Sequence, residues 1–321
     1  MSHPVIEQSQ KDALQTFFGP RLKMSESLSR YSVMQVGGPA DFLAIANNVD
    51  ELEADVSFLW ENGIPFILLG SGSNTLISDA GIREFVLINE AKNIDFIEQE
   101  GKAPRLWAES GASFGSLARR AGAKGWSGLE WAAGIPGTVG GAVVNNAGAF
   151  GSNVAENLEM ANILQPLGDK VQRFDWSVDQ FEYDYRKSVI KTGVKQAVVL
   201  SATFKLKNST PEAVKGRISA ISEKRQTSQP QGASLGSMFK NPPGDFAGRL
   251  IEEAGLKGTR IGDVEISSVH GNFFLNQGAA TANDIANLIA LVRDKVSEKF
   301  GIELELEIQF IGDWNKEKNG R

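Results

Sequence analysis

The chain has 321 residues, of which 41% are hydrophobic and 22% charged, and its formal net charge is -6. This size suits two or three globular domains, and the acidic balance argues against a broad nucleic-acid-binding surface. The chain contains no cysteine and only two histidines, His3 and His270, which excludes disulfides, thiolate catalysis and iron–sulfur clusters and argues against a His-based metal cage.

The first 30 residues are polar with one short amphipathic patch, and we interpret them as an N-terminal arm. They lack the basic and apolar regions of a signal peptide. No apolar run in the sequence reaches the length of a membrane span. A cytoplasmic enzyme or binding protein is therefore expected.

A β-α-β unit is predicted next. Residues 41–46, 64–69 and 85–88 have the apolar character of strands. Between the first two, apolar residues at helical spacing predict a helix that Asp50 caps and Gly63 ends.

The loop at 70–74 reads GSGSN and follows the second strand of this unit. A Rossmann fingerprint is disfavoured because Thr75 stands where the third glycine belongs and no helix pattern follows. Successive N–H groups could still form an anion-binding nest. A plain turn is the alternative.

A second glycine-rich segment, 134–151, reads GIPGTVGGAVVNNAGAFG. So many glycines would weaken a core strand, and the apolar residues among them are unusual for a linker. The segment is either a cluster of tight turns or backbone that must approach a ligand closely. A short helix capped by Ser113 is predicted before it.

Strands are predicted at 171–176 and 197–206, and a domain boundary near 207–211. Pro211 is suited to the first turn of the helix that follows. The buried face of this helix is predicted to contain Val214, Ile218 and Ile221.

The C-terminal part is predicted to contain a helix at 245–254, a strand at 270–276 and a long amphipathic helix ending at Gly301. Thr281 and Asp284 form a potential capping box for that helix. Residues 302–311 alternate apolar and polar side chains, which predicts a strand.

Ser237, in the segment GSMFKNP, is a candidate proton donor. A serine hydrolase is disfavoured because no GxSxG elbow is present and His270 is the one plausible base; we interpret that histidine as structural. Lys240 and Asn241 could hold a phosphate or carboxylate. A turn serine in a solvated loop is the alternative.

Arg186 follows two tyrosines in the segment YDYRKS, and its guanidinium could bind a carboxylate or phosphate with two hydrogen bonds. An ordinary surface arginine is the alternative. Three glutamates alternate along 302–311, either on a solvated strand face or opposite a cationic group. They are Glu303, Glu305 and Glu307.

Taken together, collinear segments from about residue 30 to 312 resemble the UDP-N-acetylenolpyruvoylglucosamine reductase (MurB) family. The segments are VGGPADFLA (36–44), LLGSGSNTLI (68–77), GLEWAAGIPGTVGGAVVNNAGAFG (128–151), YDYRKS (183–188), KRQTSQP (224–230), GSMFKNP (236–242), GRLIEEAGLKGTRIGDVEIS with HGNFFLN (248–276), and LELEIQFIG (304–312).

The resemblance implies an α+β fold, with an FAD-binding domain of the vanillyl-alcohol-oxidase (PCMH) type in two subdomains and a C-terminal α+β MurB domain. The expected organisation is an arm at 1–29, the FAD domain at 30–208 with subdomains of about 30–90 and 91–208, a substrate domain at 209–312 and a tail at 313–321.

The resemblance also implies the reaction, in which NADPH reduces FAD and reduced flavin transfers hydride to the enolpyruvyl ether of UDP-N-acetylglucosamine, giving UDP-N-acetylmuramate for peptidoglycan. Ser237 would donate the proton to the neighbouring carbon. Arg186 and Glu307 would stabilise the enolate-like carboxylate, Glu307 being protonated or acting through a partner.

Substrate contacts are expected from Tyr185, Lys240 and Asn241. FAD contacts are expected from Gly70, Ser71, Gly72, Ser73, Asn74, Pro136, Gly137, Thr138, Gly140, Gly141, Asn146 and Gly148.

No histidine lies near either glycine loop and cysteine is absent, so FAD is expected to be non-covalent. No tyrosine follows Tyr185, which resembles the shorter-loop branch of the family. The protein is expected to be a monomer. A related flavin oxidase that uses oxygen, and a non-catalytic sugar-nucleotide binder with a decayed flavin site, remain alternatives.

Overall fold

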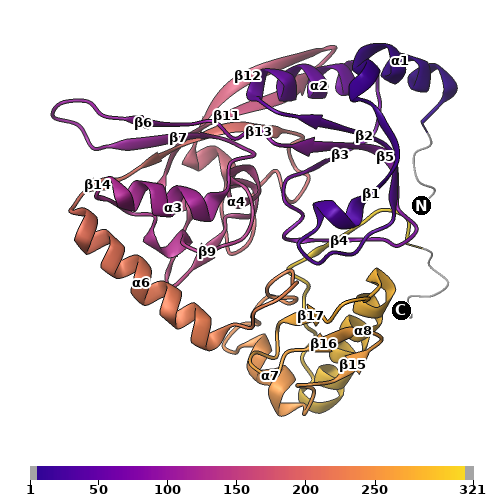
Figure 1. The fold of residues 1–321 in the computed structure, drawn as a ribbon, viewed down its shortest axis with the longest axis vertical. Coiled ribbons are helices and arrows are strands. Elements are labelled where there is room, and N and C mark those ends of the chain that lie inside the picture. The colour runs from indigo at the N-terminus through magenta and orange to yellow at the C-terminus, as the bar shows by residue number, and fades with distance from the viewer. Residues whose placement is uncertain (1–5, 315–321) are drawn as a thin grey trace. The chain divides into compact units, whose positions relative to one another are not determined.

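The computed structural model describes residues 6–314, and the chain folds as two compact units (Figure 1). Unit 1 contains Met1–Leu43, Ser71–Val86 and Arg225–Arg321, and unit 2 contains Ala44–Gly70 and Leu87–Lys224. The domain limits expected from the sequence remain predictions, and nearly all of the 313–321 tail lies outside the described residues.

The N-terminal arm is folded onto unit 1. Helix α1 (Gln8–Phe18) buries Leu14 and Phe18, and the Phe18 ring stacks on Phe85 with centroids 4.7 Å apart. Strand β1 (Lys23–Ser27) then pairs antiparallel with β2 (Pro39–Ala46). The amphipathic patch seen in the sequence is therefore the core-facing side of a helix.

Four strands lie in the order β1-β2-β5-β3, with β5 at Ile82–Asn89 and β3 at Phe66–Leu69. The division between the units falls within β2 and β5. Strand β4 (Thr75–Ile77), which directly follows the 70–74 loop, pairs parallel with β18 (Gln309–Ile311). This pairing ties the end of the chain to the first glycine loop.

The rest of unit 1 is a small α+β assembly. Its elements are α7 (Ala247–Glu253), β15 (Arg260–Ile261), β16 (Val264–Ile266), β17 (Phe274–Asn276) and α8 (Ala282–Phe300). The capping box of Thr281 and Asp284 is confirmed, and Gly301 ends α8 with a φ of 66°. Five apolar side chains at helical spacing on α8 are buried in the core of this part: Ile285, Leu288, Ile289, Val292 and Val296.

Unit 2 is built on an antiparallel five-stranded sheet in the order β12-β11-β13-β7-β6. The strands are β6 (Ile94–Ile97), β7 (Arg105–Glu109), β11 (Leu158–Leu167), β12 (Lys170–Ser177) and β13 (Val198–Lys205). Helices α3 (Phe114–Ala123) and α4 (Val139–Asn145) lie on one side of this sheet (Figure 1). Short strands complete the unit: β8 (Trp126–Ser127), β9 (Gly148–Ala149), β10 (Ser152–Asn153) and β14 (Lys207–Asn208).

Three further helices belong to unit 2: α2 (Val49–Glu61), the one-turn α5 (Val154–Asn157) and most of α6 (Pro211–Ser228). The N-cap of α2 is Asn48, whose side chain accepts from Glu51 N, so the predicted cap at Asp50 was wrong by two residues. In α6 only Val214 is buried, because Ile218 and Ile221 lie at a partly exposed edge.

The long C-terminal strand predicted at 302–311 was also wrong. Its apolar residues do point inward, but regular pairing is limited to β18 because the parallel partner β4 is three residues long. Earlier residues make irregular bonds instead, such as Lys240 N to Glu305 O at 2.8 Å. None of the described helices combines the length and the apolar content needed to cross a membrane.

Candidate active site

The 136–141 part of the second glycine segment is the start of helix α4. Thr138 is its N-cap, with its Oγ1 accepting from Gly141 N at 3.3 Å. Val139 N donates to Ala112 O at 2.9 Å and Gly140 N donates to Ser110 O at 2.7 Å. Because the protein itself uses these amides, this helix start does not offer them to a phosphate.

Most glycines expected to contact a cofactor are required by the protein fold itself. Gly137 has a φ of 118°, which other residues rarely adopt. A Cβ at Gly70 would lie 2.6 Å from Thr138 Oγ1, one at Gly140 would lie 3.0 Å from Ser110 Cβ, and one at Gly148 would lie 2.8 Å from Ser152 O.

Gly141 differs from these glycines. Its φ is not positive, it is exposed, and the nearest atom to an added Cβ is Thr138 Oγ1 at 3.5 Å. A glycine inside a helix costs about 0.5–1 kcal/mol relative to alanine. Since the protein gives no steric reason for glycine here, Gly141 points to a ligand that approaches the first turn of α4.

The 70–74 loop does have the properties of an anion-binding nest. No described residue accepts from the backbone N–H groups of Ser71, Gly72, Ser73 or Asn74. Gly72 has a φ of 60° and lies against the backbone of Tyr31, where a Cβ would be 2.4 Å from the carbonyl oxygen. Successive unpaired amides around a left-handed residue are a typical anion site.

Buried side-chain oxygens without partners gather in both glycine segments. In the described part of the chain they include Ser71 Oγ and Thr75 Oγ1 beside the first loop and Asn145 Oδ1 and Asn153 Oδ1 in and after the second. Buried polar groups normally have partners, so each requires an explanation. FAD carries hydroxyl and imide N–H donors and a diphosphate, and the residues present fit such a cofactor.

The YDYRKS segment forms a tight turn closed by Lys187 N donating to Asp184 O at 3.1 Å. Arg186 has a left-handed φ of 55° in this turn. Its Nη2 donates to Gly148 O at 3.0 Å, and its guanidinium lies 5.9 Å from the ring of Tyr185, which is 55% exposed. The guanidinium is therefore held against the second glycine segment.

Asn146 joins this turn to α4. It ends the helix with a φ of 44°, its Nδ2 donates to Asp184 O at 3.2 Å, and its Oδ1 accepts from Ala155 N at 3.1 Å. Its side chain is thus engaged by the protein, and its predicted cofactor contact stays a prediction. The Asn146 side chain therefore connects the second glycine segment to the turn that contains Arg186.

In unit 1, the segments that carry Ser237 and Glu307 lie side by side. Glu307 N donates to the carbonyl of Met238 at 2.9 Å. Asn74 Nδ2 donates to Glu307 O at 3.1 Å, which links the 70–74 loop to the segment just before β18. Ser237 forms a backbone bridge with Phe273. The structure thus brings Ser237, Glu307 and Asn74 together, whereas Arg186 belongs to unit 2.

Sequence reasoning missed Asn272, which fixes the backbone next to Ser237. It is 3% exposed, its O accepts from Met238 N at 2.9 Å, and its side chain both accepts from Phe239 N at 2.9 Å and donates to Phe239 O at 2.8 Å. The only signal was its place in the segment HGNFFLN.

Two residues predicted to bind substrate have partners within unit 1. Lys240 forms an ion pair with Glu305, and Asn241 Oδ1 accepts from Ala247 N at 3.1 Å at the start of α7. Arg293 lies 4.0 Å from Glu303. Cationic groups therefore lie near Glu305 and Glu303, whose side chains are nevertheless 72% and 70% exposed, as on a solvated face.

His270 has the surroundings of a structural residue. Its Nδ1 accepts from Asn272 N at 3.2 Å. Burial, followed by the nearby charge of Lys257, lowers the pKa of the His270 imidazole below its usual value. The burial and the hydrogen bond agree with a structural role for His270, which stays a prediction.

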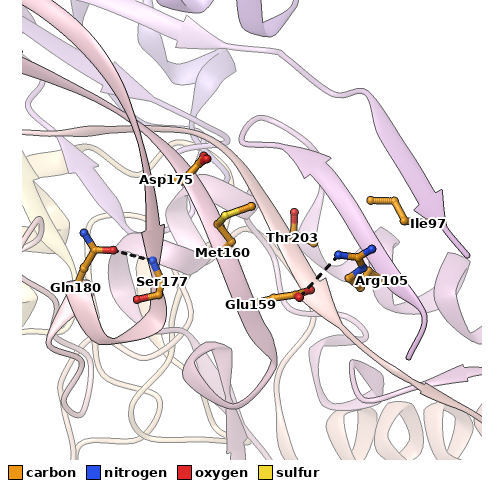
Figure 2. A pocket seen from close by; sticks show the side chains of 8 residues that line it. All are labelled: Ile97, Arg105, Glu159, Met160, Asp175, Ser177, Gln180 and Thr203. Atoms are coloured by element: carbon orange, nitrogen blue, oxygen red, sulfur yellow. Dashed lines mark hydrogen bonds and ion pairs between the residues drawn. The ribbon is translucent and has the colours of Figure 1, made fainter. Parts of the chain in front are cut away.

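Unit 2 also has a surface depression of about 390 Å³ that contains none of the predicted site residues (Figure 2). Figure 2 shows its two internal contacts, Arg105 with Glu159 at 3.8 Å and Ser177 N donating to Gln180 at 2.9 Å. It is an open depression over strands of the sheet.

Comparisons with known families match most of the chain. Residues 40–172 match an FAD binding domain, and residues 228–311 match the C-terminal domain of UDP-N-acetylenolpyruvoylglucosamine reductase. The two matches lie on the two sets of residues described above, the glycine segments and the Ser237–Glu307 region.

Known relatives extend over nearly the whole length. UDP-N-acetylenolpyruvoylglucosamine reductases from Chloroflexus aurantiacus and Rubrobacter xylanophilus are 44% and 42% identical, covering 89% and 94% of this chain and 96% and 98% of theirs. The crystal structure of the Thermus caldophilus reductase is similar with a TM-score of 0.73 and 34% identity, covering 90% of this chain and 97% of that one.

Proposed function

The chain belongs to the UDP-N-acetylenolpyruvoylglucosamine reductase (MurB) family, and we propose how its residues share that family's reaction. The enzyme is a UDP-N-acetylmuramate dehydrogenase of peptidoglycan synthesis. It uses FAD and NADPH to reduce UDP-N-acetyl-3-O-(1-carboxyvinyl)-glucosamine to UDP-N-acetylmuramate.

FAD, held by the amides of residues 71–74, would supply the hydride chemistry that carries a hydride from NADPH to the vinyl carbon of the substrate. Ser237 then donates its hydroxyl proton to the neighbouring carbon, on which negative charge develops. In support, the two residues that follow Ser237 are held by the buried Asn272, whose O accepts from Met238 N and whose carboxamide bonds to the backbone of Phe239. A positioned donor of this kind contributes typically 10²–10⁴-fold.

Arg186 and Glu307 stabilise the carboxylate into which that charge spreads. The planar guanidinium matches a carboxylate with two hydrogen bonds. Glu307 helps when it is protonated or when a donor lies between it and the carboxylate, since two negative charges would repel.

The amides of 71–74 are proposed to bind the diphosphate of FAD, and the first turn of α4 at Gly141 to lie against the cofactor. FAD is held without a covalent bond. Direct contacts of Lys240 and Asn241 with the substrate and of Asn146 with FAD are also proposed, in addition to the protein partners that these side chains have. We further propose that the enzyme is a cytoplasmic monomer of the shorter-loop branch.

The observation that carries this assignment is the bond from Glu307 N to Met238 O, which sets both predicted catalytic side chains of unit 1 on adjacent segments. We predict that Ser237→Ala leaves flavin reduction by NADPH nearly intact and slows reoxidation by the enolpyruvyl substrate by about 10²–10⁴-fold. Stopped-flow absorbance of the flavin measures the two half-reactions separately.

Ser234→Ala is the matched control, because Ser234 lies in the same loop and its Oγ accepts from Gly236 N at 3.2 Å. It should leave both half-reactions within about twofold. An equal loss of both half-reactions in Ser237→Ala would show that Ser237 is structural. Rapid reoxidation of the wild-type enzyme by air alone would favour an oxidase instead.

A further inference from the structure

The tip of the β9–β10 hairpin has an unusual residue. Ala149 pairs with Ser152, so the turn consists of Phe150 and Gly151, whose φ values of 54° and 84° are both positive. Two-residue hairpin turns of this geometry favour Asn-Gly or Gly-Gly. A bulky aromatic residue at positive φ is an outlier that costs on the order of 1–3 kcal/mol.

Core packing does not explain Phe150, because its side chain is 38% exposed. The ring instead lies 5.6 Å from Nζ of Lys224, near the end of α6. A cation over an aromatic face at this distance is attracted by the ring. Strained residues are found where function requires the side chain, and here the ring positions an ammonium group.

Two contacts attach helix α6, which carries Lys224, to the rest of unit 2. Arg217, two helical turns earlier and on the same face, donates from Nε to Glu130 Oε1 at 2.8 Å. Val214 packs against Gly122 of α3, with its Cγ1 3.1 Å from where a Cβ would stand. The part of α6 that ends at Lys224 is therefore anchored within unit 2.

The same hairpin holds a second cation. Gly148, in β9, accepts from Arg186 Nη2, two residues from the Phe150 ring that faces Lys224. The substrate has two anionic groups on one sugar ring, the carboxylate of the O3 enolpyruvyl ether and the diphosphate on C1. Arg186 and Lys224 thus each contact this hairpin from outside it, and the substrate brings two anionic groups for the two cations.

We propose that Lys224 binds the diphosphate of the nucleotide ligands and that Phe150 is its positioning residue; this rests on the function proposed above. NADPH carries the same diphosphate, so Lys224 serves both half-reactions. A lysine is suited to phosphate because its ammonium is a compact point charge. Arg186 remains the carboxylate contact.

The test measures binding of UDP-N-acetylglucosamine, which has the diphosphate and lacks the carboxylate, to the oxidised holoenzyme by calorimetry. Lys224→Gln should raise its Kd about tenfold and lower the dependence of log Kd on salt. Lys215→Gln, the same charge change at an exposed site on α6, is the control and should leave Kd within about twofold.

Phe150→Ala should raise the Kd about three- to tenfold, and Phe150→Trp should restore it, because indole is the best cation–π partner. NADP⁺ binding should weaken in parallel in Lys224→Gln. Unchanged binding of UDP-N-acetylglucosamine in that variant, or Phe150→Trp as weak as Phe150→Ala, overturns the proposal.

These binding measurements need no turnover. If the wild-type enzyme showed no reductase activity, that result would overturn the proposed function and leave the diphosphate assignment to the binding measurements. A raised KM for the enolpyruvyl substrate with normal binding of UDP-N-acetylglucosamine would assign Lys224 to the carboxylate and overturn the diphosphate assignment.

Discussion

Arg186 occupies a backbone conformation that glycine or asparagine would adopt more easily. Its φ of 55° falls at the third position of a turn closed between Asp184 and Lys187. This conformation costs about 1 kcal/mol, and the guanidinium that it positions donates to Gly148 O in the second glycine segment. An observed strain of this kind supports a functional reason for arginine.

We predict that Arg186→Gly separates stability from activity. Relief of the left-handed strain should offset the lost bond to Gly148, leaving the free energy of unfolding within about 1 kcal/mol of wild type. Substrate-dependent reoxidation of the flavin should fall about 10²–10³-fold, because the developing carboxylate charge loses its donor. Urea unfolding and single-turnover kinetics measure the two effects.

Arg186→Ala provides the comparison, because alanine loses the same bond and keeps the strain. It should be less stable than Arg186→Gly by about 1 kcal/mol. If Arg186→Gly were instead several kcal/mol less stable than wild type, the guanidinium would be mainly structural.

At the scale of residues, the motif segments contained both the proposed catalytic side chains and those that position them, but they did not reveal the positioning role. Ser237 and Glu307 stand in segments whose letters resemble the family. Asn272 acts through backbone 33 residues away, and Phe150 acts through a turn type that its own identity disfavours. Neither periodicity nor composition indicates such a contact, because both depend on tertiary geometry.

The two adjacent glycines of helix α4, Gly140 and Gly141, have different surroundings. Gly140 is required because a Cβ would press on Ser110, whereas Gly141 has space around it. The sequence presents both as equivalent members of one glycine pair. Only the structure separates the glycine that the fold needs from the glycine that a ligand explains.

We predict that Gly141→Ala stabilises the FAD-free protein by about 0.5–1 kcal/mol, because alanine is the better helix former. The same methyl group should weaken FAD binding at least tenfold by occupying the space against the first turn. Thermal unfolding of the FAD-free protein and fluorescence titration with FAD give the two values. Gly140→Ala should lose stability, and unchanged FAD affinity in Gly141→Ala would contradict the contact.

Helix α6 is almost entirely exposed, so its attachment depends on few contacts. Glu130, 8% exposed, accepts from Arg217 Nε and from Gly128 N at 2.7 Å. Burial alone would raise the pKa of the Glu130 carboxyl. The bonds from Gly128, the Glu130 amide, Arg217 and Ser127 outweigh burial and hold it below its usual value of 4.5.

A group whose pKa is lower in the folded state stabilises the fold above its unfolded pKa, and that stabilisation is lost as pH falls through the folded pKa. Glu130→Gln should therefore be about 1–2 kcal/mol less stable than wild type at neutral pH, with Arg217 half-exposed. The difference should shrink below pH 4.5. Urea unfolding across pH tests this, and a pH-independent difference would exclude the ion pair as its source.

Strand β11 was not predicted from the sequence, and its pairing explains why. Its pairing with β13 shifts register between Leu158 and Met160 and again between Asn162 and Ile163. Each shift interrupts the alternation of inward and outward side chains, which is the main sequence signal of a strand. By contrast, α8 has uninterrupted helical spacing and a capping box, and its prediction was confirmed almost to the residue.

The chain returns to unit 1 at Arg225, after residues Leu87–Lys224 have formed most of unit 2. Unit 1 is assembled from three separate stretches, and β4 pairs with β18 across more than two hundred residues of sequence. Local patterns cannot indicate such a pairing, because neither three-residue strand is distinctive on its own. The FAD-binding and MurB C-terminal domains were correctly predicted because the collinear order of many weak motifs spans the chain.

The composition of the whole chain bears on how FAD is attached. The chain has no cysteine, and its two histidines, His3 and His270, lie outside both glycine segments, so we expect FAD to bind without a covalent bond. We predict that acid precipitation of the yellow holoenzyme releases all flavin into the supernatant, as measured by its absorbance. His270→Gln should purify with the same flavin content, and flavin remaining with the washed precipitate would contradict non-covalent binding. Colourless wild-type protein that fails to take up added FAD would remove the flavin site altogether.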